Sequence, residues 1–534
     1  MNRSSGDPGV SRGHSRMGSR GWVPTEGPKD TRASKQRRTT MHGSQKTLES
    51  FAESSPTESE EGRKGAVSMG VTQSAEKATY DHLIPMVIND DNIDRALERV
   101  VGNRGAPGID GMTVEELALW TAINREELKD VIESGRYIPT PVRRKEIPKD
   151  NGGVRNLGIP TVKDRLVQQM IAQVLEPIYD PTFSDASFGF RPGRSGQDAV
   201  MRVREYYDQG YVHAVGIDLE KFFDKMNQEM LMNILRERIK DKVLIQLVKR
   251  FLRAGVLMPD GLVHQTPLGA PQGGPLSPLL SNIYLDKMDK EMERRGLALV
   301  RYADDTLILL KSRRAAERVC ETVTKYLEYE LKLKVNREKT EIGSPLRLKF
   351  LGFKLSRNKI GTGFVPHPKA VAKFKKRVRK ITKRNRGVPL ERVLKELNSY
   401  TRGWFGYFGM TTSKELVQNL DGWMRRRIRQ YVVKQWKRKW TQVKNLKPLC
   451  PVKWQCPDGS CSLEWVKLCW GSVRTKSYWK MADSPAVKQG LSNSWLHGQG
   501  MVFLSDDWEK VKERCANRRV PTGSHGGVRG QPTD

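Results

Sequence analysis

The sequence lacks any long hydrophobic run. No stretch of about 18 consecutive apolar residues occurs in the 534 residues, so we expect neither a membrane-spanning helix nor a membrane partner. The N-terminus also lacks the apolar core of a secretory signal. We therefore expect the chain to stay in the cytoplasm.

Cysteine is scarce as well. The chain has 6 cysteines, and no two of them form a C-x-x-C pair, which is a frequent half of a zinc site. Four nevertheless cluster late in the chain, and two interpretations stay open for them: zinc ligands, or free thiols in a reducing cytoplasm. These four are Cys450, Cys456, Cys461 and Cys469.

Acidic residues are too few to balance the basic ones. The chain has 94 Lys and Arg against 61 Asp and Glu, which gives a formal net charge of +33 and a pI of about 9.9. So much positive charge indicates a polyanionic partner, with a generically basic soluble protein as the alternative. Nucleic-acid binding should depend strongly on salt, because phosphate contacts release counterions.

Residues 1–75 contain almost no apolar periodicity and are rich in Ser, Gly, Arg, Thr and Glu. This composition is typical of disorder. Two interpretations stay open: a basic tethering arm, or an over-extended start, because Met69 opens a more ordinary sequence.

Two adjacent carboxylates stand between apolar runs. Residues 299–301 and 306–310 favour β-structure, and residues 302–305 between them read YADD, which predicts a hairpin. Neighbouring carboxylates repel each other, and a divalent cation relieves the repulsion because hard cations take carboxylate oxygens. An ordinary acidic turn is the alternative.

A further carboxylate, Asp218, ends a predicted buried strand at residues 212–217. An aspartate at the end of one strand, together with an Asp-Asp hairpin, is the arrangement of a polymerase palm. There two Mg²⁺ ions about 3.5–4 Å apart, for which Mn²⁺ can substitute, serve in-line phosphoryl transfer. We predict that Asp218 and Asp304 hold both ions and that Asp305 is a supporting ligand.

Local signals predict other elements. Residues 141–149 and 154–160 read as two strands, and the turn between them is rich in hairpin residues. Hydroxyl residues precede several helical stretches and should accept a hydrogen bond from the first turn. The predicted helix caps are Thr113, Thr161, Ser195 and Ser277.

Three motifs follow one another along the chain: FGFRPGRS at 188–195, PQGGPLSP at 271–278 and YADD at 302–305. With them the chain resembles the reverse transcriptase/maturase proteins of bacterial group II introns, of the endonuclease-free type. The resemblance covers residues 104 to about 440 and, more weakly, 477–508. It implies an α+β fold: a right-hand polymerase, with fingers and an antiparallel palm sheet packed on helices, followed by an α-helical thumb called maturase domain X.

The resemblance also implies five segments. They are an N-terminal extension (1–75), a second extension with the fingers (76–210), the palm (211–360), the thumb (361–445) and a maturase-associated, DNA-binding-like tail (446–534). No His-Asn-His constellation occurs in the tail, so we expect no nuclease.

Roles at the nucleotide site follow from the same resemblance. Phe223 would lie under the sugar of the incoming nucleotide, where a bulky ring excludes a 2′-hydroxyl and favours dNTPs. Lys339 would protonate the leaving pyrophosphate, with a surface ion pair as the alternative. Leu219 would join the metal site. The predicted substrate-binding residues are Lys149, Arg155, Phe222, Phe223 and Gln272.

Beyond residue 366 basic residues alternate with aromatics. Basic helices predicted at 369–380, 390–401 and 416–440 suit a nucleic-acid groove. In the 188–195 motif, we expect Phe188 and Phe190 in the core rather than as stacking platforms. The predicted nucleic-acid-binding residues are Arg191, Arg194, Lys375, Lys376, Arg379, Arg425 and Arg426. For Arg191 and Arg194 the alternative is a structural contact within the protein.

The implied function is RNA-directed DNA synthesis combined with intron binding that assists splicing and retrohoming. The implied partners are group II intron RNA, an RNA template with a DNA primer, dNTPs and target DNA. The implied place is the bacterial cytoplasm, at the nucleoid during integration. Two alternatives are a maturase whose polymerase is idle, and a reverse transcriptase of a retron, a diversity-generating element or a defence system. The oligomeric state and the insertion site stay open.

Overall fold

The computed structural model describes residues 78–148, 154–358, 361–475, 477–508 and 510. All of them belong to the second of two units into which the chain divides, Ala66–Asp534. No helix among these described residues is long and apolar enough to cross a membrane.

A four-stranded sheet lies at the centre of the middle third of the chain. Its order is β6-β7-β3-β8, and every pairing in it is antiparallel. The predicted strand and hairpin both belong to it. The strands are β3 (His213–Ile217), β6 (Ala298–Tyr302), β7 (Asp305–Leu310) and β8 (Glu341–Gly343).

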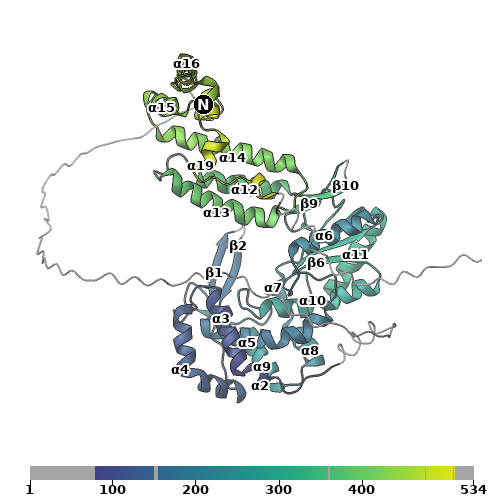
Figure 1. Cartoon of the computed structure of the whole chain (residues 1–534). Coiled ribbons are helices and arrows are strands. Elements are labelled where there is room, and N and C mark those ends of the chain that lie inside the picture. Colours follow the sequence, from purple (N-terminus) through teal and green to yellow (C-terminus); the bar gives the residue numbers. More distant parts are fainter. Residues whose placement is uncertain (1–77, 149–153, 359–360, 476, 509, 511–534) are drawn as a thin grey trace, which may run out of the picture. The chain divides into compact units, whose positions relative to one another are not determined.

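Both faces of this sheet are covered, because side chains alternate along each strand. Val215 and Ile217 of β3 belong to the large core that α10 and α11 complete, whereas Ala214 faces a smaller core formed with α6. This burial explains why the strands read as continuous apolar runs. Figure 1 shows α6, α10 and α11 around this part of the chain. The covering helices are α6 (Gly196–Asp208), α10 (Ser277–Arg294) and α11 (Arg313–Tyr329).

The N-terminal helices join the same large core. Thr113 forms a capping box with Glu116, and the hydroxyls of Thr161 and Ser195 accept hydrogen bonds at the starts of their helices, as predicted. The helices are α2 (Ile84–Val87), α3 (Asp90–Gly102), α4 (Val114–Glu133) and α5 (Val162–Tyr179), followed by the 3₁₀ turn η1 (Asp180–Thr182). Three more helices join this core: α7 (Phe222–Lys225), α8 (Gln228–Arg238) and α9 (Lys242–Leu252).

A second sheet, of order β2-β1-β4-β5, contains the predicted fingers hairpin. β1 pairs antiparallel with β2, from Arg143 opposite Ile159 to Pro148 opposite Val154, and parallel with β4. The strands are β1 (Val142–Pro148), β2 (Val154–Ile159), β4 (Val256–Leu257) and β5 (Val263–His264).

The described residues of the C-terminal third form one hairpin and a set of helices, and the helices enclose a separate core that includes Trp465 and Phe374. The hairpin strands are β9 (Phe353–Asn358) and β10 (Gly361–Pro366). The longer helices are α12 (Pro368–Ile381), α13 (Leu390–Phe408), α14 (Lys414–Gln435), α15 (Lys439–Leu446) and α16 (Leu463–Val473). The shorter ones are η2 (Lys447–Leu449), η3 (Val452–Trp454), α17 (Tyr478–Met481), α18 (Pro485–Gly490) and α19 (Asn493–Gly498).

Two local predictions were wrong. Ser277 is the first residue of α10 rather than its cap: Leu276 takes the cap position, and the Ser277 hydroxyl donates to the carbonyl of Pro271 at 2.7 Å. The helix predicted over 416–440 ends at Gln435, and Lys437 takes a left-handed φ of 47° before α15 begins.

Candidate active site

The β6–β7 hairpin ends in a two-residue turn that carries Asp304. Tyr302 pairs with Asp305, so Ala303 and Asp304 form the turn. Ala303 has a φ of 56°, in the left-handed region that costs an L-residue about 1–2 kcal/mol. A turn held in this conformation needs support from its surroundings.

A buried arginine gives that support. Arg301, 0% exposed, donates to the carbonyl of Ala303 at 3.0 Å and to the carboxylate of Asp289 at 2.8 Å. The same guanidinium donates to Asn282 at 3.0 Å and to the Ser187 hydroxyl at 2.8 Å. The five donors of an arginine can serve several acceptors at once, so one side chain ties the turn to α10 and to the 184–191 segment.

Asp218 lies beside this turn. β3 pairs with β7 as far as Ile217 opposite Thr306, so Asp218, the next residue, lies across from Asp305. The structure thus brings Asp218, Asp304 and Asp305 to one end of the sheet. The buried Oδ2 of Asp218 receives no hydrogen bond from any residue that the structure describes, and the Nζ of Lys339 lies 3.4 Å from this oxygen.

Asp305 lies in crowded surroundings although its side chain keeps solvent access. Desolvation and, to a smaller extent, the neighbouring charges of Asp304 and Asp218 together raise the pKa of its carboxyl to about 6, although Lys349 opposes the rise. The negative charge is therefore in excess at this end of the sheet. A bound cation would relieve it.

The donor chemistry here fits a hard divalent cation, because the candidate ligands are carboxylates and one of their buried oxygens accepts no hydrogen bond within the described residues. No group of three or more His, Cys, Asp or Glu side chains within the described ranges forms a ready-made metal cage. That statement includes the late cysteines, of which Cys450, Cys456, Cys461 and Cys469 are all free thiols.

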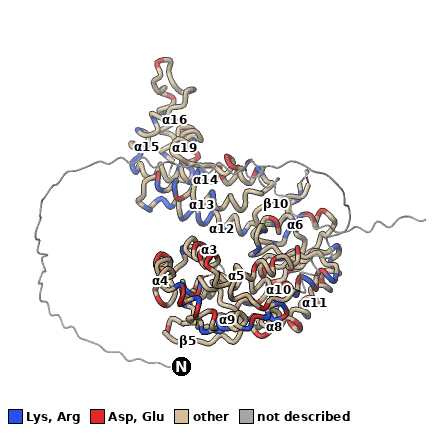
Figure 2. The backbone as a smooth tube through the Cα atoms, turned by 60° about the horizontal axis from the view of Figure 1, so that its bottom comes forward, with Lys and Arg blue, Asp and Glu red and all other residues tan. Residues whose placement is uncertain are grey.

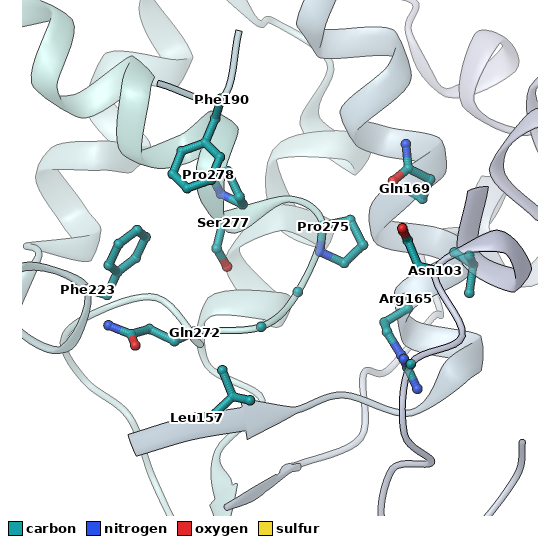
Figure 3. Close-up of a pocket in the computed structure, with 14 residues that line it drawn as sticks. Asn103, Leu157, Arg165, Gln169, Phe190, Phe223, Gln272, Pro275, Ser277 and Pro278 are labelled. Carbon is teal, nitrogen blue, oxygen red and sulfur yellow. The ribbon is translucent and has the colours of Figure 1, made fainter. Parts of the chain in front are cut away.

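A cavity of about 500 Å³ opens near the hairpin. Phe190, Phe223 and Gln272 surround one end of it, and Arg165 and Gln169 lie at the other (Figure 3). This volume lies within the usual range for a small-molecule site, about 300–1,000 Å³.

The loop that carries Gln272 is fixed against β2. The carbonyl of Gln272 accepts a hydrogen bond from the backbone N–H of Gly158 at 2.8 Å. Gly273 has a φ of 128°, and a Cβ at this position would lie 2.4 Å from the carbonyl oxygen of Gly158. Only glycine therefore permits this approach of the loop to the strand.

Comparison with known proteins identifies the arrangement. Residues 147–355 match the family described as reverse transcriptase (RNA-dependent DNA polymerase), and residues 371–449 match the maturase-specific domain of group II introns. The chain is 33% identical over 300 residues to Protein YkfC of Escherichia coli K12, an alignment that covers 49% of this chain and 78% of that protein. The chain belongs to the group II intron reverse transcriptase/maturase family.

The other matches are shorter. The group II intron-encoded protein LtrA of Lactococcus lactis is 42% identical over 171 residues, which is 31% of this chain and 28% of LtrA. A solved structure titled "Partial Cas6-RT-Cas1--Cas2 complex" shares 26% identity, covers 46% of this chain and 43% of its own, and has a TM-score of 0.30. The family match, with the antiparallel sheet and the helices that follow it, confirms the predicted α+β right-hand polymerase with a helical maturase domain.

The residues predicted to contact the nucleotide or the metal differ from one another in their surroundings in this family member. Phe223 lines the cavity, whereas Phe222 is 3% exposed and packs against Tyr284. The substrate contact of each stays a prediction. Leu219 buries its side chain, which leaves its backbone carbonyl as the group for a cation. Arg155 lies on β2 opposite Ile147, but its side chain is outside the described residues, as is the whole of Lys149.

The guanidinium groups of the two arginines in the 188–195 motif contact other groups of the protein. Arg191 is 8% exposed, and it donates to Asp180 and to the carbonyls of Ser184 and Ser187. Burial and these acceptors agree with a structural role for the guanidinium, and its nucleic-acid contact stays a prediction. Arg194 pairs at the surface with Asp185 at 2.7 Å.

The thumb helices carry basic side chains beside aromatic rings. Lys375 and Arg379 of α12 both lie over Trp423, at 5.7 and 5.5 Å from the ring centroid. Lys and Arg recur along α12 and the helices next to it (Figure 2), and Lys376 is exposed there. Cations over rings are typical of surfaces that take a nucleic-acid strand.

Arg425 and Arg426 of α14 lie among C-terminal residues. Arg425 lies 5.3 Å from the Phe503 ring centroid, and Arg426 lies 3.7 Å from the Trp479 ring centroid and pairs with Asp483 at 3.3 Å. Both side chains therefore also join the thumb to the tail.

Sequence reasoning missed two features of the site. Arg301 stands in an otherwise apolar strand, and a charged residue in a buried run is the signal that a buried partner exists. Phe190 was predicted to be in the core, and this was wrong: its side chain is 51% exposed and lines the cavity. Its neighbour Phe188, at 2% exposed, is the core residue.

Proposed function

We propose that this protein is an active RNA-directed DNA polymerase that also serves its intron as a maturase. One observation carries the proposal: Asp218, Asp304 and Asp305 lie at one end of the sheet, beside a hairpin whose Tyr302 contacts Phe190 in the wall of a cavity of about 500 Å³. The alignments to LtrA-like relatives cover under a third of their length, so the activity, substrates and partners of the whole protein are part of this proposal.

Asp218 and Asp304 would hold two Mg²⁺ ions, with Asp305 and the carbonyl of Leu219 in support, and Mn²⁺ would substitute. Such ions activate a primer 3′-hydroxyl and neutralise charge on the transferred phosphate. Mg²⁺ commonly uses one or two carboxylates together with substrate phosphates rather than an all-protein cage. That preference agrees with the carboxylates seen here and with the lack of a preformed cage among the described residues.

The remaining residues would bind, select and protonate. Lys339, next to Asp218, would hold the proton that the leaving pyrophosphate takes. The ring of Phe223 would exclude a 2′-hydroxyl, and Gln272 would contact the nucleotide. Lys149 and Arg155 would contact its triphosphate, Lys as a point charge and Arg through its planar fork.

The thumb and tail would recognise the intron. Basic side chains of α12 and α14 would contact intron RNA, stabilise its splicing-competent fold and later engage target DNA, while the splicing chemistry stays with the RNA. The proposed place is the bacterial cytoplasm, at the nucleoid during integration. The proposed segments are 1–75, 76–210, 211–360, 361–445 and a nuclease-free tail at 446–534.

The test is nucleotide selection during RNA-templated extension of a DNA primer. Wild type should extend with dNTPs and poorly with rNTPs, and Phe223→Ala should reduce this preference about tenfold or more, because the ring no longer fills the space of a 2′-hydroxyl. Extension by wild type with neither nucleotide would contradict the polymerase proposal. It would leave an RNA-binding maturase, which splicing of the flanking intron RNA would then test.

A further inference from the structure

Phe190 takes a costly conformation that exposes its ring. Its φ is 56°, in the left-handed region that bulky L-residues rarely adopt, and its side chain is 51% exposed. Two residues earlier, Phe188 takes the ordinary buried place. Exposure and backbone strain both disfavour the observed state of Phe190, so its surroundings must impose it.

The surroundings fix the chain on both sides of Phe190. A Cβ at Gly189 would lie 2.3 Å from the backbone nitrogen of Ala303, so the segment presses directly against the catalytic turn. The side-chain amide of Asn282 donates to the carbonyl of Gly189 at 2.8 Å, and the buried guanidinium of Arg191 holds the other side. The ring direction is therefore set by the fold.

The ring faces the cavity at the end nearest the catalytic hairpin. Phe190 lines it together with Phe223 and Gln272 (Figure 3). The centroid of the Phe190 ring lies 6.4 Å from that of Tyr302, the residue that directly precedes the turn that carries Asp304. An exposed aromatic face at this position is suited to a planar, uncharged ligand group.

We propose that the Phe190 ring is a stacking platform for a nucleobase at the polymerising centre, and thus a positioning residue for the reaction. This inference rests on the proposed polymerase function. The nucleobase belongs either to the incoming nucleotide or to the template, since both present the same π-face to an aromatic ring.

Three variants separate stacking from structure. Phe190→Asn removes the ring but tolerates the left-handed backbone, so its Tm should equal or exceed that of wild type. Phe190→Trp keeps an aromatic face. Tyr329→Asn removes a ring that is 71% exposed at the end of α11, and it serves as the matched control for loss of an exposed aromatic.

The readout is steady-state extension of a DNA primer on an RNA template. Phe190→Asn should raise KM about tenfold, the usual effect of losing one base–aromatic contact, while Phe190→Trp and Tyr329→Asn stay close to wild type. A raised KM for dNTP assigns the incoming base. A raised KM for primer–template that disappears on a template lacking the base opposite the incoming nucleotide assigns the template base.

Equal KM values for Phe190→Asn and wild type would overturn the inference and leave the polymerase function intact. If wild type does not polymerise, the polymerase proposal fails. The Kd of a fluorescent primer–template, measured by anisotropy, then tests separately whether a nucleobase stacks on Phe190. Equal Kd values for Phe190→Asn and wild type would then overturn it.

Discussion

At the scale of single residues, the conformation of the β6–β7 turn depends on side chains that are buried away from solvent. Arg301 and Asp289 are both fully buried, and the arginine also holds the carbonyl of Ala303. A buried ion pair is weak support for stability as such, but removing one partner is expensive. We infer that this pair keeps the turn that carries Asp304 in its left-handed conformation.

Breaking the pair should uncouple stability from activity. Arg301→Ala should lower the free energy of unfolding by about 3–5 kcal/mol, because Asp289 is left buried without its partner. The double replacement Arg301→Met with Asp289→Leu should recover much of that loss but not kcat, because Ala303 still lacks its donor.

Denaturant unfolding measures the first quantity and primer extension the second. A double variant with wild-type kcat would contradict the positioning role of Arg301.

At the scale of elements, close backbone approaches align the fingers with the palm. The loop before α10 meets β2 through Gly273 and Gly158, and the 184–191 segment meets the β6–β7 turn through Gly189. These approaches leave no space for a side chain. The elements that carry Gln272 and Asp304 are thereby held by main-chain contact.

A methyl group at Gly273 should separate the loop from β2. Gly273→Ala should raise KM for dNTP. The added methyl group would push the loop away from β2, and Gln272, the preceding residue, would move with the loop. Gly261→Ala is the control: it also has a left-handed φ, 87°, but no heavy atom lies within 4 Å of a Cβ placed there.

The control should lose only about 1–2 kcal/mol of stability from its backbone conformation. Steady-state kinetics on both variants provides the check. An equal KM effect in the two would show that backbone strain, rather than the contact with Gly158, is responsible.

The sequence predicted much at this scale, and its failures have physical causes. The hairpin with YADD, the strand before Asp218 and the caps at Thr113, Thr161 and Ser195 rest on local patterns, and the structure has them. Phe188 and Phe190 have the same local pattern, and only tertiary contacts at Gly189 and Arg191 send one inward and the other into the cavity. The cap at Ser277 failed because α10 begins one residue earlier than predicted, so Ser277 lies inside the first turn and Leu276 takes the cap position.

At the scale of the whole molecule, a net charge of +33 and the basic thumb helices predict affinity for polyanions. Lys375 and Arg379 share the ring of Trp423, which orients two cations on one patch of α12. We expect this patch to take part in RNA binding through phosphate contacts.

The salt dependence of RNA binding tests this expectation. Log Kd against log salt should be steep for wild type, and Lys375→Gln with Arg379→Gln should lower the slope by about 1–2, one per lost phosphate contact. Lys325→Gln removes a surface charge that pairs with Glu321 on α11 and should leave the slope unchanged. An unchanged slope in the double variant would contradict the assignment of this patch.

The central claim is that Asp304 is part of a polymerase centre, and one measurement tests it most directly. Wild type and Asp304→Ala are compared in Mg²⁺-dependent extension of a DNA primer on an RNA template, with Tm recorded for both. Extension should vanish in the variant while its Tm stays equal or rises, because one of the repelling carboxylates is gone. A well-folded Asp304→Ala that extends the primer as wild type does would contradict the account.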